Sequence, residues 1–137
     1  MTTINDIQLI DIPKIHEIRG NLSVIEGNTI PFEMKRVYYL YDVPSGAERG
    51  GHAHNKLLQF MVALSGSFDV ILKDGDKQKT VTLNKPNVGL LIPNAIWREL
   101  QNFSSGSVCL VVASEVYEEE DYIRDYNDFL LSKNGIS

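Results

Sequence analysis

The stretch GAERGGHAHNKLLQFMVALSG, residues 46–66, combines a closely spaced histidine pair with a nearly continuous apolar run, and glycines border it at both ends. His52 and His54 stand one residue apart in a chain that holds only three histidines. Because side chains alternate between the two faces of a β-strand, a strand here points both imidazoles to the same side. The pair therefore predicts a metal site, a site of proton chemistry, or two ordinary strand histidines.

Short β-rich runs broken by turn residues flank this stretch. The junction Asp74-Gly75-Asp76 is typical of a tight hairpin, because Asp-Gly readily takes the positive φ that such a turn requires. Many short, closely spaced strands predict an all-β sandwich or small barrel rather than a βαβ fold. No linker or internal repeat divides the sequence, so we expect one domain over residues 1–137. The expected strands are residues 37–43, 57–64, 67–73, 78–83, 88–93, 95–100 and 107–114.

The C-terminal segment alone changes its hydrophobic period. Tyr122, Tyr126, Phe129 and Leu130 recur at helical spacing. Acidic residues 118–121 precede them, where a helix N-terminus favours negative charge. We therefore expect a short amphipathic helix that docks its Tyr, Phe and Leu side chains on the barrel.

Charge and composition exclude several classes of function. The formal net charge of -5 argues against a nucleic-acid surface and against a polybasic membrane patch. No apolar run approaches the roughly 18–20 residues that span a bilayer, and the N-terminus does not resemble a secretory signal. The single cysteine, Cys109, cannot form an internal disulfide, which favours a reducing compartment. We expect a cytoplasmic protein without nucleic-acid or membrane partners.

The spacing of the opening stretch resembles the first motif of the cupin superfamily, in which the position of Gln59 normally holds a glutamate. The stretch PNAIWREL, residues 93–100, matches the second motif, with Arg98 in place of its histidine. Arginine has no lone pair to donate, and its charge beside a divalent ion is unfavourable. We therefore expect a site without metal or cofactor, with a catalytic metal and purely structural histidines as the alternatives.

Imidazole, guanidinium and phenol groups together suit proton transfer next to a carbonyl. Histidine titrates near neutral pH, and a nearby cation favours its neutral, proton-accepting form. The same cation can stabilise an oxyanion as it develops. Tyr38 or Tyr39 offers a phenol donor, although strand parity lets only one of the two face inward. These groups predict abstraction of a proton next to a carbonyl through an enediolate.

Longer strings carry a more specific resemblance, which covers nearly the whole chain. The strings are PF-x-x-KRVYY, RG-x-HAH and ASE-x-Y-x-E-x-DYIRDY. They resemble the dTDP-4-keto-6-deoxy-D-glucose 3,4-ketoisomerases of the cupin superfamily, which are related to the WxcM-like group. The resemblance implies a double-stranded β-helix, or jelly-roll, barrel and a homodimer that exchanges N-terminal strands. It also implies a metal-free reaction that moves the keto group of a dTDP-linked 4-keto-6-deoxy sugar from C4 to C3.

The same resemblance implies roles for individual residues. His52 is the candidate base for the C3 proton, His54 assists as a second acid/base or binds sugar oxygens, and Tyr38 is the hydroxyl donor. Cations are needed for the diphosphate. Lys35 and Arg36 face opposite ways on a strand, and Arg36 is preferred because bidentate phosphate contact favours arginine geometry. The implied substrate-binding residues are Arg19, Gln59 and Arg98 at the sugar, and Arg36 and Arg49 at the diphosphate.

Two other functions fit the same residues. A sugar-nucleotide epimerase would also remove a proton next to the ketone, and a binding module would hold the sugar nucleotide without turnover. The residues do not choose between the gluco and galacto forms of a 3-keto product.

Overall fold

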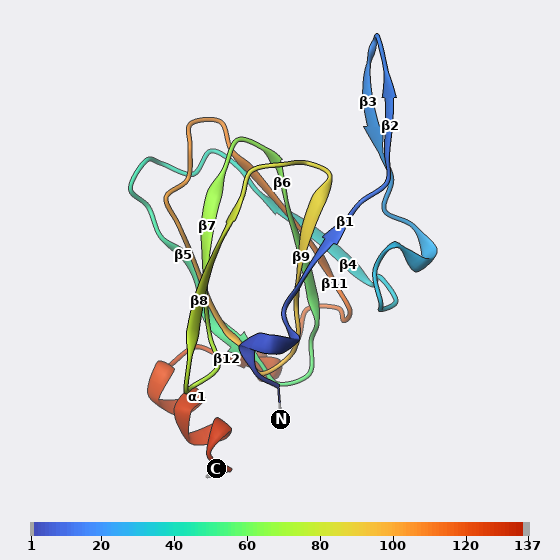
Figure 1. Ribbon diagram of the computed structural model, residues 1–137. Helices are drawn as coiled ribbons and strands as arrows, with labels where there is room; N and C mark the ends of the chain where they lie inside the picture. The colour runs from blue at the N-terminus through green and yellow to red at the C-terminus, as the bar shows by residue number, and fades with distance from the viewer. Residues whose placement is uncertain (1, 136–137) are drawn as a thin grey trace.

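Two five-stranded antiparallel sheets face each other in the computed structural model, which describes residues 2–135 (Figure 1). The strand order is β1-β9-β6-β11-β4 in the first sheet and β12-β5-β10-β7-β8 in the second. The strands of the first sheet are β1 (Gln8–Asp11), β9 (Val88–Ile92), β6 (Gln59–Ser65), β11 (Val108–Ala113) and β4 (Arg36–Leu40). Those of the second are β12 (Tyr122–Ile123), β5 (Arg49–His54), β10 (Trp97–Gln101), β7 (Phe68–Lys73) and β8 (Gln78–Leu83). The predicted all-β architecture is confirmed.

The space between the sheets holds the main core, and strand alternation decides which side chains enter it. On β6, Gln59, Met61 and Ala63 point inward, while Phe60 and Val62 belong to a second apolar cluster on the outer side. Both faces of β6 are therefore buried, which explains why its sequence is a nearly continuous apolar run. The Asp74–Lys77 turn joins β7 to β8, because the Asp74 carboxylate accepts hydrogen bonds from the backbone N–H groups of Asp76 and Lys77.

The outer faces of the two sheets are covered differently. Ile12 and Ile30 pack over the first sheet, near the short 3-10 helix η2 (Gly27–Thr29). The C-terminal helix α1 (Tyr126–Lys133) covers the second sheet, where Phe129 is completely buried against Ala53 and Trp97. The predicted docking of a short C-terminal helix through aromatic side chains is confirmed.

Tyr122 lies outside this helix, so its assignment to the helical face is wrong. The acidic segment forms a 3-10 turn, η3 (Glu119–Asp121), and Tyr122 follows it in β12, paired with His54 of β5. The helix begins only at Tyr126, after the Asp125 side chain has accepted a hydrogen bond from the Asp128 N–H. Pairing with the edge of β5 decides this conformation, and it turns the Tyr122 ring toward the barrel interior.

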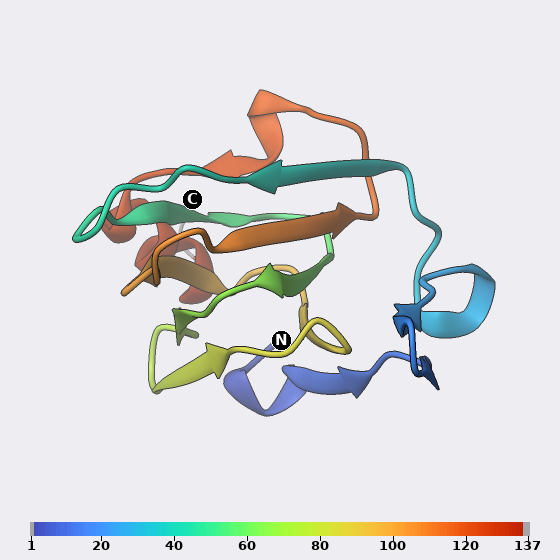
Figure 2. The same cartoon turned by 90° about the horizontal axis from the view of Figure 1, so that it is seen from above.

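A two-stranded hairpin, β2 (Lys14–Glu17) and β3 (Gly20–Ser23), projects away from the barrel, and we call it the arm (Figure 1). It follows η1 (Ile4–Asp6) and β1, and Figure 2 shows it on the side of the barrel opposite α1. Every residue of its strands is exposed, and Ile18 at its tip is 100% exposed. The arm therefore contributes nothing to the core of its own chain.

Candidate active site

A cavity of about 560 Å³ lies between the two sheets and collects most of the residues singled out in the sequence. Tyr38 faces this cavity, whereas Tyr39 on the same strand is 59% exposed on the outer side. Arg36 also lines it, while its neighbour Lys35 contacts Glu115 at the surface. The lining residues are Arg36, Tyr38, Leu40, Arg49, Gly50, Gly51, His52, Gln59, Met61, Arg98, Leu100, Val111, Tyr117, Tyr122 and Arg124.

An irregularity in the pairing of β5 with β10 shapes the wall beside His52. Arg98 pairs with His52, but Leu100 pairs with Arg49, so the register shifts by one residue between them. Gly50 lies in this shift with a φ of 82°, a conformation that L-residues rarely adopt. Such bulges re-aim side chains, and this one leaves both Arg49 and His52 on the cavity.

Arg98, Gln59 and Tyr38 form a continuous hydrogen-bonded chain. The Arg98 guanidinium donates from Nη1 to the Gln59 Oε1 at 2.5 Å and from Nη2 to the Ile96 carbonyl at 2.8 Å. The Gln59 Nε2 donates to the Tyr38 hydroxyl oxygen at 3.0 Å. Burial lowers the pKa of Arg98 to about 10, so the guanidinium is still charged at neutral pH. The barrel thus holds a cation where metal-binding cupins have a histidine.

His52 faces the cavity as a neutral ring. Burial lowers its pKa to about 3, and the charges of Arg98 and Arg124 act in the same direction. Its Nε2 is buried and has no hydrogen-bond partner among residues 2–135. A neutral imidazole in this position can accept a proton from a molecule in the cavity.

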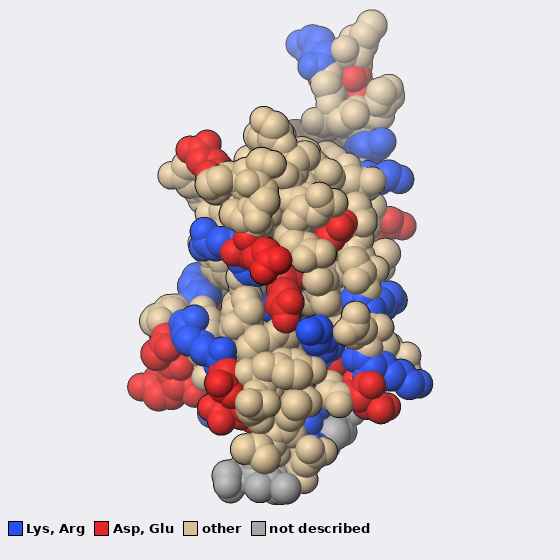
Figure 3. Space-filling model, turned by 90° about the vertical axis from the view of Figure 1, so that its left-hand side faces the viewer, with Lys and Arg blue, Asp and Glu red and all other residues tan. Residues whose placement is uncertain are grey.

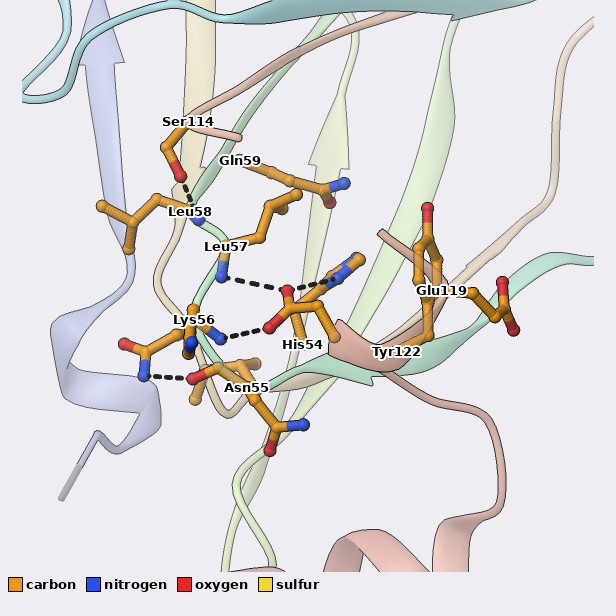
Figure 4. Close-up of polar contacts among 12 residues, drawn as sticks. His54, Asn55, Lys56, Leu57, Leu58, Gln59, Ser114, Glu119 and Tyr122 are labelled. Atoms are coloured by element: carbon orange, nitrogen blue, oxygen red, sulfur yellow. Dashed lines mark hydrogen bonds and ion pairs between the residues drawn. The ribbon is translucent and has the colours of Figure 1, made fainter. Parts of the chain in front are cut away.

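His54 is placed differently, although it shares the strand face of His52. It is completely buried and does not line the cavity, because Tyr122 packs over it with ring centroids 4.4 Å apart. Its Nδ1 lies 3.3 Å from the Asp121 carboxylate, which also accepts the backbone N–H groups of Lys56 and Leu57 (Figure 4). Burial lowers the pKa of His54 to about 2, and the charge of Arg98 acts in the same direction. His54 therefore lies against His52 as a second neutral ring, with ring centroids 4.8 Å apart.

Arg19 does not reach the cavity of its own chain. It lies in the turn of the arm, where its side chain is 86% exposed and its guanidinium contacts Glu17 at 3.4 Å. Of the predicted substrate-binding residues, the structure brings together Arg36, Arg49, Gln59 and Arg98, and it leaves Arg19 apart.

The C-terminal segment contributes residues that the sequence interpretation missed. Tyr117, Tyr122 and Arg124 all line the cavity. Arg124 stacks 4.2 Å from the Tyr122 ring centroid and pairs with Glu119 at 2.8 and 2.9 Å. Two tyrosines, four acidic residues and an arginine within residues 117–124 were the available signal, but helical spacing obscured it.

Surface charge, potential metal ligands and helix length each bear on what the protein binds. On the face shown in Figure 3, basic and acidic side chains are interspersed, so the net negative charge forms no continuous acidic surface there. Within residues 2–135, no group of three or more His, Cys, Asp or Glu side chains is arranged to hold a metal ion. None of the helices in the described part of the chain is long and apolar enough to cross a membrane.

The fold and the cavity define a cupin-type barrel whose site combines imidazole, phenol and buried guanidinium groups. The chain belongs to the family described as FdtA: WxcM-like, C-terminal, which matches residues 5–134. It is 48% identical over 123 residues to a TDP-4-oxo-6-deoxy-alpha-D-glucose-3,4-oxoisomerase of Aneurinibacillus thermoaerophilus, and the match covers 89% of this chain and 88% of that one.

Solved structures agree with this family. A sugar 3,4-ketoisomerase from Thermoanaerobacterium thermosaccharolyticum in complex with TDP has a TM-score of 0.93 and 43% identity, covering 95% of this chain and 96% of that one. A histidine-to-asparagine mutant of the same enzyme, in complex with TDP-4-keto-6-deoxyglucose, has a TM-score of 0.93 and 42% identity, covering 95% of both chains. The predicted cupin-type barrel is confirmed, and so is the predicted class, an isomerase of the 3,4-ketoisomerase type.

Proposed function

We propose that the protein moves the keto group of dTDP-4-keto-6-deoxyglucose from C4 to C3, as a step in deoxysugar biosynthesis. One observation carries the proposal: a neutral His52 faces a cavity that also presents the Tyr38 hydroxyl and the buried charge of Arg98. The relatives that are 48% and 42–43% identical support the substrate, since their names or bound ligands include TDP or its 4-keto-6-deoxy sugar. We further propose that residues 1–137 act as one domain.

The reaction needs two proton transfers at carbon and two at oxygen. His52 removes the proton from C3, and the electrons of that C–H bond form a C3=C4 double bond. The C4 oxygen takes a proton at the same time, which gives an enediol. The C3 hydroxyl then loses its proton, a C3 carbonyl forms, and C4 receives a proton from the imidazolium. The sum is an isomerisation that consumes no oxidant, reductant or co-reactant.

Arg98 supplies the electrostatic part of this mechanism. Its charge favours neutral His52 before reaction and stabilises the negative charge that develops on the sugar oxygens. Once that charge forms beside the imidazole, it favours the imidazolium, so His52 becomes a stronger base along the reaction path. His54 is not exposed to the cavity, which favours a role in holding the His52 ring rather than in binding sugar oxygens.

Two arginines on the cavity wall suit the diphosphate. Arg36 and Arg49 make no ion pair with any carboxylate of residues 2–135, so their charges are available for an anion. Arg36 lies between the rings of Tyr38 and Tyr117, 5.0 and 5.5 Å from their centroids, and this stacking orients its planar group. Arg124 is already neutralised by Glu119 and is the weaker candidate.

We also propose a homodimer in which the arm packs on a second copy. Ile15, Ile18 and Leu22 are exposed on the arm, and Val37 and Tyr39 are exposed on the outer face of the edge strand β4. An isolated two-stranded hairpin is at best marginally stable in water, so the arm requires a second surface. In such a dimer, Arg19 contacts the sugar in the cavity of the other subunit. The cytoplasmic location stays a prediction.

The proposed function is tested by incubating the protein with dTDP-4-keto-6-deoxyglucose in heavy water and following the sugar by NMR. We expect the carbonyl to move from C4 to C3, with deuterium at C4 to the extent that the His52 imidazolium exchanges its proton with solvent. A carbonyl that stays at C4 while C3 exchanges its proton would identify an epimerase. Binding with neither movement of the carbonyl nor C–H exchange would identify a non-catalytic sugar-nucleotide module. Adding an aminotransferase and determining the configuration of the amino sugar then reports the C4 stereochemistry.

A further inference from the structure

We propose that Gln59 is a positioning residue whose amide makes the Tyr38 hydroxyl a hydrogen-bond donor to the substrate. This inference rests on the proposed ketoisomerase reaction, in which an oxygen on C4 must take a proton. It changes the role predicted for Gln59, because both ends of its amide are engaged by the protein and its side chain is completely buried.

The orientation of the Gln59 amide follows from chemistry. A guanidinium has only donors, so the amide atom that faces Arg98 must be the oxygen. The nitrogen is then the atom that faces Tyr38, and it can only donate. Arg98 is itself held by the Ile96 carbonyl. The buried guanidinium therefore determines which group donates and which accepts in each hydrogen bond from Arg98 to Gln59 to Tyr38.

The consequence for Tyr38 concerns its single hydroxyl hydrogen. The phenol oxygen accepts from Gln59, and the hydroxyl donates to no acceptor among residues 2–135. Its hydrogen is therefore left for a molecule in the cavity that Tyr38 lines. Burial raises the pKa of Tyr38, although Arg98 opposes this, so the phenol carries its proton at neutral pH.

A carboxylate in place of the amide would reverse the last hydrogen bond. Glutamate is the residue that the cupin motif normally has at this position, and an ionised carboxylate only accepts. It would take one hydrogen bond from Arg98 and a second from the Tyr38 hydroxyl, which would turn the phenol hydrogen away from the cavity. Glutamine keeps the contact with Arg98 and donates to the Tyr38 oxygen, which leaves the phenol hydrogen directed at the cavity.

Every proton that moves in this step has a donor and an acceptor. Tyr38 gives its proton to the C4 oxygen, and the phenolate that forms is stabilised by the Gln59 donor and the nearby charge of Arg98. The phenolate then takes the proton of the C3 hydroxyl as the C3 carbonyl forms. Tyr38 moves protons between oxygens while His52 moves one between carbons, and neither residue is changed at the end.

The test is a double-mutant cycle on the full-length protein, with wild type, Gln59→Glu, Tyr38→Phe and the double variant. We expect Gln59→Glu to lower kcat about as much as Tyr38→Phe does, roughly 100-fold, a typical effect of losing an acid/base group. The Kd for TDP should stay within about threefold of wild type, because neither change touches the proposed diphosphate arginines. The double variant should be no slower than Tyr38→Phe alone, within about twofold, because Gln59 acts through the phenol.

Several outcomes overturn the inference. A Gln59→Glu protein with wild-type kcat would do so, and so would an equal fall in kcat when the change is made in the Tyr38→Phe background. Gln59→Met provides a second variant of similar length that cannot donate and accepts only weakly, and it should show the same non-additivity. Thermal unfolding of each variant identifies a loss of fold. A wild type without turnover overturns the proposed function and this role together, whereas turnover with additive effects overturns only the role of Gln59.

Discussion

The barrel interior and the arm differ in burial and in the contacts that each makes with its own chain. Inside the barrel, Arg98 and Gln59 are almost completely removed from water, and each is held by hydrogen bonds within its own chain. On the arm, no residue is buried, and apolar side chains such as Ile18 face solvent. The interior therefore holds its polar groups in place through its own chain, whereas the arm has a use only against another surface. The predictions below test this division between an interior ordered by its own chain and an arm that depends on a second copy.

The largest effect is expected for His52→Asn, which keeps a polar side chain but cannot accept the C3 proton. We expect kcat to fall about 1,000-fold, within the range for loss of a general base, with the Kd for TDP nearly unchanged. His16→Asn on the arm is the matched control and should stay within about twofold of wild type. Steady-state kinetics and calorimetry provide the measurements. Equal losses at both histidines would contradict the separate roles of barrel and arm.

A smaller but clear effect is expected on stability from Phe129→Ala, which opens a cavity between α1 and the second sheet. Truncating a completely buried Phe costs about 3–5 kcal/mol of unfolding free energy. Ile18→Ala at the fully exposed tip should cost less than about 0.5 kcal/mol in the monomer. Urea unfolding at two protein concentrations measures both changes. If Ile18→Ala lowers the urea midpoint only at the higher concentration, where the dimer forms, the arm contributes through dimerisation.

A loss of about tenfold in kcat/KM is expected for Arg19→Ala, because one charged hydrogen bond to the sugar is removed. Complementation then separates the two subunits. Mixed dimers of Arg19→Ala and His52→Asn subunits contain one intact site if Arg19 acts in the other subunit, so the specific activity should rise above that of either variant. If mixing subunits brings no gain although sedimentation shows exchange, Arg19 does not act across a dimer.

The smallest effect is expected from pH. The active form of His52 is neutral, and its pKa is lowered from 6.5 to about 3, so acidification from pH 7.5 to 5.5 should change kcat/KM less than about twofold. A histidine with an unshifted pKa would be only about a tenth neutral at pH 5.5.

The same shift affects stability. His52 binds more protons in the unfolded chain than in the folded one below about pH 6.5, so the unfolding free energy falls as pH falls toward 3. Rates are therefore compared where circular dichroism shows an intact fold, and a tenfold loss at pH 5.5 would contradict the shifted pKa.

Much of the site could be predicted from local alternation. Period two predicts that Tyr38 and Tyr39 face opposite ways, and so do Lys35 and Arg36. The family resemblance chose Tyr38 and phosphate geometry chose Arg36, and the structure has both at the cavity. The same rule puts His52 and His54 on one face, but it does not determine depth. Tyr122 covers His54, and no pattern predicted this, because a strand of two residues has no periodicity of its own.

The sequence by itself determined the all-β barrel, the family and the inward side chains of each strand, because these depend on local period and on strings of neighbouring residues. Only the tertiary structure decided that Tyr122 leaves the helix, that Arg19 lies outside the cavity of its own chain, and that Gln59 donates a hydrogen bond to Tyr38. Arg98 and Tyr38 stand 39 and 21 residues away from Gln59 along the chain. The direction of a hydrogen bond depends on which donor meets which acceptor in space, and packing of three strands brings these groups together.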